Sequence, residues 1–308
     1  MAAGPAAGHR DVEVNALHVC CVTDGKPGHR SQLQGLVQAL SARIPTQVEW
    51  LERDTPARTP TPPDLILAAG HRTHWRALRL KWKYRAPLVV LMKPSLPRWL
   101  FDLCVIPEHD GVPPSAKVLV TRGMLNDMQP APAADPRHGL VLLGGPSAHY
   151  DWDDAQILEQ LKRLSTLLPA VRWQVTTSRR TPLALTEKLA ALDIPDIAFT
   201  AFADTQPGWV REQLQRCGVA WVSEDSASMV YEALTAGARV GVLDVPRRGE
   251  SRVSRGLDAL RWAGLVCDLH TLAARGAMPA PAQPLDETGR VARYLVRWLR
   301  PALEALDD

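Results

Sequence analysis

The chain has 308 residues, more than a single hydrophobic core usually serves, so we expect two domains of about 130 to 150 residues each. Its formal net charge is only +3 and its charges are interspersed, which argues against a dedicated nucleic-acid-binding protein. Its five cysteines include no Cys-x-x-Cys pair and mostly fall in apolar runs, which predicts buried reduced thiols, no zinc site and a cytoplasmic protein. We expect neither a signal peptide nor a membrane span, because no apolar run has the required length.

The first predicted strand, 16–22, leads into the loop Thr23-Asp-Gly-Lys-Pro-Gly-His29 and then into a helix. Gly25 and Gly28 allow a tight turn, and Lys26 stands at its rim. The order of residues is neither that of a P-loop nor that of a dinucleotide fingerprint. Ser31 and Gln34 have the spacing of a capping box, which predicts that the helix begins just after the loop; its apolar face is Leu33, Leu36, Val37 and Leu40.

The remainder of the first half alternates predicted strands with one basic helix. His71 follows one of these strands, and Glu108 and His109 follow another, so each is either part of a polar turn or a second-rank candidate base. Proline-rich residues 126–138 have the composition of an interdomain linker. The predicted strands are 47–51, 64–70, 87–92, 101–106 and 116–121, and the helix is 72–83.

Residues 72–99 combine basic and aromatic side chains. No acidic residue occurs in this segment. Basic residues with interfacial aromatics are typical of proteins that dock on an anionic membrane, whereas a solvated basic face over core tryptophans is the alternative. Nucleic acid is a weaker third option because the overall charge is nearly balanced. The residues are Arg72, Arg76, Arg79, Lys81, Lys83, Arg85, Trp75, Trp82, Tyr84 and Trp99.

The second half repeats the alternation of strand and helix, which implies a parallel sheet in each half. Ligands of such sheets gather at the carboxyl ends of the strands. Three loops rich in glycine or serine fall at such ends, within residues 23–29, 141–147 and 222–228. The predicted strands are 140–143, 172–177, 197–201, 220–223, 239–243 and 265–269; the helices are 154–168, 182–192, 209–217, 226–236, 253–263 and a final one, 287–306, that returns to the first domain.

Residues 222–238 read as a strand end, a hydroxyl-rich turn and an amphipathic helix. Asp225 or Ser226 would cap this helix, and its free amides and dipole would favour a diphosphate. Glu232 lies two turns further on, where a ribose attached to the diphosphate would reach. The alternative is an ordinary strand-to-helix turn with a good cap.

Five motifs follow one another along the chain. They are Asp24-Gly-Lys-Pro-Gly-His29 with Gln32, Phe101-Asp with Pro107-Glu-His-Asp110, Gly144-Gly-Pro-Ser147, Thr177-Ser-Arg179 and Ser223-Glu-Asp-Ser-Ala-Ser-Met229. In this order they resemble those of the mitochondrial-fission Elm-type family, from about residue 18 to about residue 300. More distantly, they resemble MurG-type transferases. The chain departs from the MurG pattern at Lys26-Pro27 and Asp225-Ser226, so the identities of donor and acceptor do not carry over.

This resemblance implies an α/β protein of GT-B-like fold, with two Rossmann-like domains whose parallel sheets face each other across a cleft. Residues 1–135 would form the acceptor-side domain, 136–285 the nucleotide-sugar domain and 286–308 the returning helix. The acceptor side would comprise Gly25, Lys26, Gly28, His71, Glu108 and His109. The donor would be bound by Gly144, Gly145, Ser147, Ser178, Arg179, Glu224, Asp225, Ser226, Ala227, Ser228, Met229 and Glu232, with Arg180 as the rival of Arg179 for the phosphate charge.

Sugar transfer with inversion needs a base for the acceptor hydroxyl and a dipolar cradle for the leaving diphosphate. His29 or Asp24 would be that base. Asp151-Trp-Asp153 could suggest a metal site, but the pair directly precedes a helix, where capping explains it. We therefore predict no metal and no cofactor besides the donor.

The leading hypothesis is a glycosyltransferase that uses a nucleotide sugar and an unknown acceptor of the cell envelope, working in the cytoplasm at the inner face of the membrane. The alternatives are a nucleotide-sugar epimerase on the same fold, which would need further acid and base groups in the cleft, and a noncatalytic interaction protein.

Overall fold

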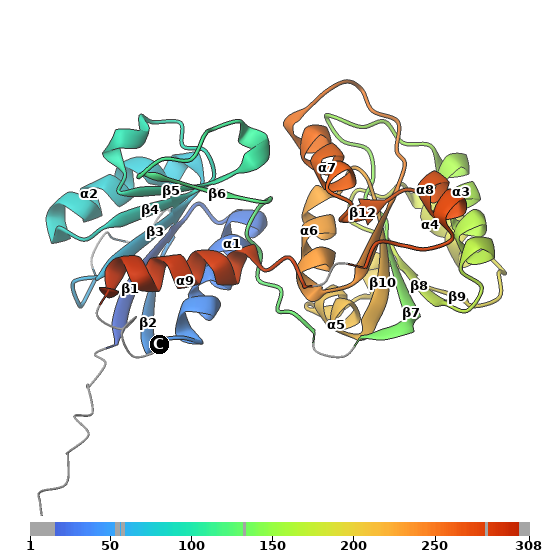
Figure 1. Ribbon diagram of the computed structural model, residues 1–308, viewed down its shortest axis with the longest axis horizontal. Helices are drawn as coiled ribbons and strands as arrows, with labels where there is room; N and C mark the ends of the chain where they lie inside the picture. Colours follow the sequence, from blue (N-terminus) through green and yellow to red (C-terminus); the bar gives the residue numbers. More distant parts are fainter. Residues whose placement is uncertain (1–15, 53–55, 57–58, 132–133, 281–282, 302–308) are drawn as a thin grey trace, which may run out of the picture.

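The protein consists of two α/β domains that lie side by side (Figure 1). The computed structural model describes residues 16–301 except 53–55, 57–58, 132–133 and 281–282. Each domain is built on a six-stranded parallel sheet with helices on both faces. The fold class predicted from the sequence is therefore confirmed.

The first sheet has the strand order β2-β1-β3-β4-β5-β6. Its central strands are buried on both faces, as expected for parallel strands covered by helices. The strands are β1 (Leu17–Thr23), β2 (Thr46–Leu51), β3 (Leu65–Ala69), β4 (Leu88–Leu91), β5 (Leu103–Pro107) and β6 (Val118–Thr121); the helices are α1 (Pro27–Ser41), α2 (His74–Tyr84), η1 (His71–Thr73), η2 (Arg98–Leu100) and η3 (Glu108–Asp110).

The second sheet has the strand order β12-β11-β10-β7-β8-β9. Its strands are β7 (Asp135–Leu142), β8 (Arg172–Thr176), β9 (Ile197–Thr200), β10 (Cys217–Ser223), β11 (Arg239–Leu243) and β12 (Val266–Cys267). Its helices are α3 (Asp154–Leu167), α4 (Leu183–Ala190), η4 (Phe202–Asp204), α5 (Trp209–Arg216), α6 (Ala227–Ala236), α7 (Arg252–Trp262) and α8 (Leu269–Arg275).

The last helix, α9 (Glu287–Leu299), belongs to the core of the first domain, although the chain before it lies in the second. Its Val291 and Leu295 are fully buried in one cluster with Leu33 and Leu36 of α1. Figure 1 shows α9 lying alongside α1. The end of the predicted helix 287–306 lies outside the described residues beyond 301.

Two segments differ from the sequence-based prediction. The segment predicted as linker is shorter, because β7 begins at Asp135; the following Pro136 is tolerated near the start of a strand. The predicted strand 265–269 is reduced to Val266–Cys267, because Asp268 accepts a hydrogen bond from the amide of Thr271 and caps the additional helix α8.

In both sheets the order of strands reverses at one point. The reversal lies between β1 and β3 in the first sheet and between β7 and β10 in the second. Open parallel sheets bind ligands at the carboxyl ends of the strands beside such a point. The loops that follow these four strands are therefore the places to look for a site.

No helix in the described part of the chain has both the length and the apolar character that a membrane span needs.

Candidate functional site

A cavity of about 350 Å³ lies between the two domains. Its first-domain wall is the start of α1 and the segment after β6, and its second-domain wall is the start of α6 and the loop after β8. The residues lining it are Pro27, Gly28, Ser31, Gln32, Met124, Leu125, Asn126, Arg179, Ser228, Tyr231 and Glu232. Four residues predicted from the sequence thus meet here: Gly28, Arg179, Ser228 and Glu232.

Helix α1 begins at Pro27, within the predicted loop. Proline suits the first helical position because its missing N–H would have no partner in the helix anyway. The capping box predicted for Ser31 and Gln34 is wrong, since the Ser31 hydroxyl donates to Asp127 Oδ1 at 2.8 Å instead. The earlier start brings the first turn of α1, including Gly28, into the cavity wall.

His29 and Asp24 form a hydrogen-bonded pair, with His29 Nδ1 2.8 Å from Asp24 Oδ1. The Asp24 side chain is 2% exposed and the His29 ring 17% exposed. Burial alone would raise the pKa of the Asp24 carboxyl, but hydrogen bonds from His29 and from the Lys26 amide outweigh burial and lower that pKa. Asp24 is therefore an ionised group that fixes the orientation of the imidazole, which leaves the other ring nitrogen for chemistry.

Gly70, at the end of β3, packs directly against this pair. Its φ is +95°, and a Cβ there would lie 2.5 Å from Asp24 Oδ2 and 2.7 Å from His29 Nδ1. Only glycine fits this approach. The pair thus sits at the point where the strand order of the first sheet reverses, although neither side chain lines the cavity.

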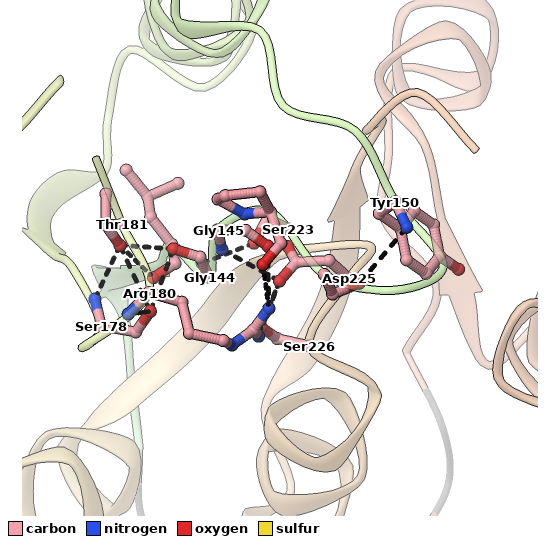
Figure 2. Close-up of polar contacts among 12 residues, drawn as sticks. Gly144, Gly145, Tyr150, Ser178, Arg180, Thr181, Ser223, Asp225 and Ser226 are labelled. Atoms are coloured by element: carbon pink, nitrogen blue, oxygen red, sulfur yellow. Dashed lines mark hydrogen bonds and ion pairs between the residues drawn. The ribbon is translucent and has the colours of Figure 1, made fainter. Parts of the chain in front are cut away.

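Five of the twelve predicted donor-binding residues belong to a closed hydrogen-bonded cluster at the reversal point of the second sheet (Figure 2): Gly144, Gly145, Ser178, Asp225 and Ser226. The Gly144 amide donates to Ser223 Oγ at 2.7 Å, and the Gly145 amide donates to Asp225 Oδ2 at 3.0 Å. A Cβ on Gly144 would collide with the Asp225 carboxylate. Ser178 Oγ donates to the Gly144 carbonyl at 3.0 Å. These groups are bonded to one another, so they shape the loops around the site.

The neighbouring arginines Arg179 and Arg180 have different surroundings. Arg180 donates to Asp225 Oδ2 at 2.8 Å and to the Gly145 carbonyl at 2.8 Å, which joins the loops after β7, β8 and β10 (Figure 2). Arg179 instead lines the cavity, with its guanidinium 5.9 Å from the centre of the Phe202 ring. Of the two rivals, Arg179 is the one placed to meet a ligand.

Helix α6 presents its first two turns to the cavity. Its N-cap is Ser226, one of the two caps predicted, but the Ser226 hydroxyl donates to the Asp225 carboxylate and accepts no hydrogen bond from the helix amides. The exposed Ser228 and the partly buried Glu232 line the cavity, one turn apart. The amides of a first helical turn have no partner within their helix, so this end of α6 attracts anions.

Glu232 has an unusual environment for a carboxyl group. Burial and the nearby Asp127 carboxylate raise its pKa to about 7, and Arg211 opposes this shift only in part. Arg211 forms an ion pair with Asp127. A group with such a pKa in a cavity is a candidate functional residue.

Glu224 forms ion pairs with two arginines and does not line the cavity. Its carboxylate is 4% exposed and accepts from Arg247 Nε at 2.8 Å and from Arg261 Nη1 at 3.1 Å. This buried cluster attaches the loop after β11 to the end of β10. Asp225 is likewise bonded to Arg180, so these two acids are placed to hold the loops, not a ligand.

The other predicted site residues are not among the described residues that line the cavity. Ser147 accepts from the amides of His149 and Tyr150 at 3.2 Å, and Ala227 and Met229 are half-buried in α6 beside Ser228. Gly25 and Lys26 are exposed in the loop before α1, and His71 is exposed in η1. Glu108 and His109 form η3, which contacts α7 of the second domain. Asp153 caps α3, as the capping explanation predicts, whereas Asp151 forms an ion pair with Arg248.

The tryptophans of residues 72–99 are not in the core. The exposed fractions of Trp75, Trp82 and Trp99 are 60%, 58% and 71%. Six basic residues of the same segment are also exposed: Arg72, Arg79, Lys83, Arg85, Lys93 and Arg98.

Sequence reasoning missed several residues at the cavity. Asp127 joins α1 to α5 through Ser31 and Arg211 and also influences Glu232. Tyr231 lines the cavity although its ring is almost completely buried. The motif around Glu232 indicated that this face of α6 belongs to a binding site. No sequence pattern indicated the same for the segment after β6.

Several solved structures share this architecture, although at low sequence identity. MurG of Acinetobacter baumannii has a TM-score of 0.53 and 13% identity, with 91% of this chain and 99% of MurG covered. UDP-GlcNAc 2-epimerase of Neisseria meningitidis, solved bound to UDP-GlcNAc, has a TM-score of 0.54 and 12% identity, covering 92% and 99%. The kitacinnamycin glycotransferase has a TM-score of 0.52 and 14% identity, covering 92% and 98%. The protein therefore has the GT-B fold.

The sequence profile of the family described as Mitochondrial fission ELM1 matches residues 27–299, and the chain belongs to this family. A stretch of 50 residues is 46% identical to the uncharacterised protein RP120 of Rickettsia prowazekii (strain Madrid E). That match covers 16% of this chain and 14% of RP120.

Proposed function

We propose that the protein is a glycosyltransferase that binds the diphosphate and ribose of a nucleotide sugar in the interdomain cavity. The observation that carries this proposal is the meeting of Arg179, Ser228 and Glu232 with the start of α1 in one cavity. The start of α6 and Arg179 would stabilise the diphosphate, both in the bound donor and as the leaving group. Glu232 would accept hydrogen bonds from the ribose hydroxyls.

The first domain would supply the acceptor side and the base. His29, oriented by the ionised Asp24, would take the proton of the acceptor hydroxyl. The imidazolium that forms would be stabilised by the Asp24 carboxylate. This role is supported by Gly28, which lines the cavity and is adjacent to His29 in the first turn of α1.

The content of the cavity favours transfer over epimerisation. Among its described lining residues Glu232 supplies the one carboxylate, whereas an epimerase would need further acid and base groups beside the sugar. The fold is shared by both classes of enzyme, so this choice depends on the cavity alone.

We also propose that the exposed basic and aromatic face of residues 72–99 docks on an anionic membrane, with an acceptor of the cell envelope. Three exposed tryptophans next to six exposed basic residues match the chemistry of an interface between headgroups and acyl chains. Of the two interpretations of this segment, core tryptophans and interfacial ones, the exposures favour the second.

A thermal-shift screen against nucleoside diphosphates and nucleotide sugars tests the proposed donor site. A ligand present at a hundred times its dissociation constant adds about 2.7 kcal/mol to the free energy of unfolding. We expect at least one nucleoside diphosphate to raise the melting temperature. No shift with any nucleotide at millimolar concentration would contradict the proposal and favour a noncatalytic interaction protein.

A further inference from the structure

Helices η3 and α7 form a contact between the two domains that is separate from the segments by which the chain crosses between them. The chain crosses once after β6 and once before α9 (Figure 1). At the η3–α7 contact, Arg252 Nη1 of α7 lies 3.0 Å from Asp110 Oδ1 of η3. The Asp110 side chain is only 6% exposed, so the ion pair is partly shielded from water.

Charges around this ion pair are complementary. On the first domain η3 carries Glu108 and Asp110. On the second, α7 carries Arg252 and Arg255. The pKa of His109 is lowered by burial, and the charges of Arg252 and Arg255 lower it further, against the opposite effect of Asp110 and Glu108. Opposite charges arranged in this way attract the two domains to each other at low ionic strength, and added salt screens this attraction.

Two buried polar atoms at this contact lack hydrogen bonds. His109 Nδ1 and the Tyr231 hydroxyl are buried and have no hydrogen-bond partner among the described residues. Both lie against Gly256 of α7, where a Cβ would be 3.2 Å from His109 Nδ1 and 3.3 Å from the Tyr231 hydroxyl. A buried polar atom without a partner costs free energy that water would restore if the domains separated.

We propose that the η3–α7 contact is an electrostatic latch that holds the two domains closed over the cavity and opens about the two crossing segments. Attraction between the charged groups favours the closed state, and hydration of His109 and Tyr231 favours the open one. Interfaces between domains of one chain are commonly weak enough for such motion. Tyr231 also lines the cavity, so the latch adjoins the site where we propose that the nucleotide binds.

Small-angle X-ray scattering of the full chain without nucleotide tests the latch, and its outcome does not depend on whether a nucleotide binds. Arg252→Glu reverses the charge of the exposed partner of the ion pair, so it would repel Asp110. We expect this variant to have a larger radius of gyration than the parent at low salt. Arg163→Glu makes the same charge change on α3, away from the first domain, and should leave the radius as in the parent.

Two further measurements use independent means of opening. The parent in 1 M salt should reach the larger radius of Arg252→Glu. Gly256→Leu should reach it at low salt, because its side chain would wedge between His109 and Tyr231. Circular dichroism would confirm that each variant is folded. If folded Arg252→Glu and Gly256→Leu both keep the parent's radius, the latch is refuted.

Discussion

At the scale of single residues, Glu232 is the most informative side chain in the site. The spacing of the 222–238 motif singled it out, but its raised pKa arises from burial and from Asp127, which is 105 positions earlier in the chain and outside every motif. The same limit applies to the arginines. Sequence alone left Arg179 and Arg180 as rivals, because only the folded loops show that Asp225 binds Arg180.

The raised pKa of Glu232 predicts a dependence of stability on pH. In the unfolded chain Glu232 ionises near pH 4.5, whereas in the folded protein it keeps its proton up to about pH 7. Between these values the folded state binds more protons, so this residue lowers the free energy of unfolding as pH rises. Glu232→Gln should therefore stabilise the protein more at pH 8 than at pH 4. Chemical denaturation at both values checks this, and an equal effect at both would contradict the shift.

The His29–Asp24 pair predicts a separation of binding from catalysis. His29→Ala should leave donor affinity nearly unchanged and reduce turnover by on the order of 100-fold, the usual scale for loss of a general base. Asp24→Asn should also slow turnover and shift its pH profile, because the imidazolium loses its carboxylate. Sugar transfer or donor hydrolysis measures both effects, with His270→Ala on the exposed face of α8 as control. A folded His29→Ala protein with the parent's turnover would eliminate His29 as base.

At the scale of elements, the sequence predicted what local periodicity determines. Apolar strands and amphipathic helices were found in the correct order, because each carries its own pattern of burial. The helix and strand boundaries that were predicted wrongly lie where a polar side chain has more than one possible hydrogen-bond partner. Ser31 could cap a helix, but its hydroxyl binds Asp127 after β6, and α1 begins earlier, at Pro27.

The face of α2 and η2 predicts binding to anionic membranes. The protein should sediment with vesicles containing phosphatidylglycerol and remain unbound with pure phosphatidylcholine. Replacing both Trp82 and Trp99 by alanine should weaken this binding about tenfold or more, since burying one large apolar side chain contributes about 1.5–3 kcal/mol.

Trp262→Ala is the matched control for this measurement, because Trp262 is 93% exposed at the end of α7, outside the 72–99 face. Equal sedimentation of the double variant, this control and the parent would contradict docking through residues 72–99.

At the scale of the whole molecule, the sequence predicted two parallel-sheet domains and placed the glycine and serine loops at the ends of their strands. It did not predict that five of the twelve donor residues would belong to one hydrogen-bonded cluster, while Arg179, Ser228 and Glu232 reach the cavity. The cluster depends on contacts among three loops of the second domain, and the cavity depends on how the two domains pack. Pairings so distant in sequence leave no periodic signal.

The most direct test of the account is calorimetric titration of the parent, Glu232→Ala and Glu159→Ala with the nucleoside diphosphate found in the screen. Glu159 is exposed on α3, away from the cavity, and serves as the matched control. We predict that Glu232→Ala weakens binding by roughly 1 to 3 kcal/mol, through loss of a charged hydrogen bond, and that Glu159→Ala binds as the parent does. Unchanged affinity in folded Glu232→Ala would contradict the placement of the nucleotide in the interdomain cavity.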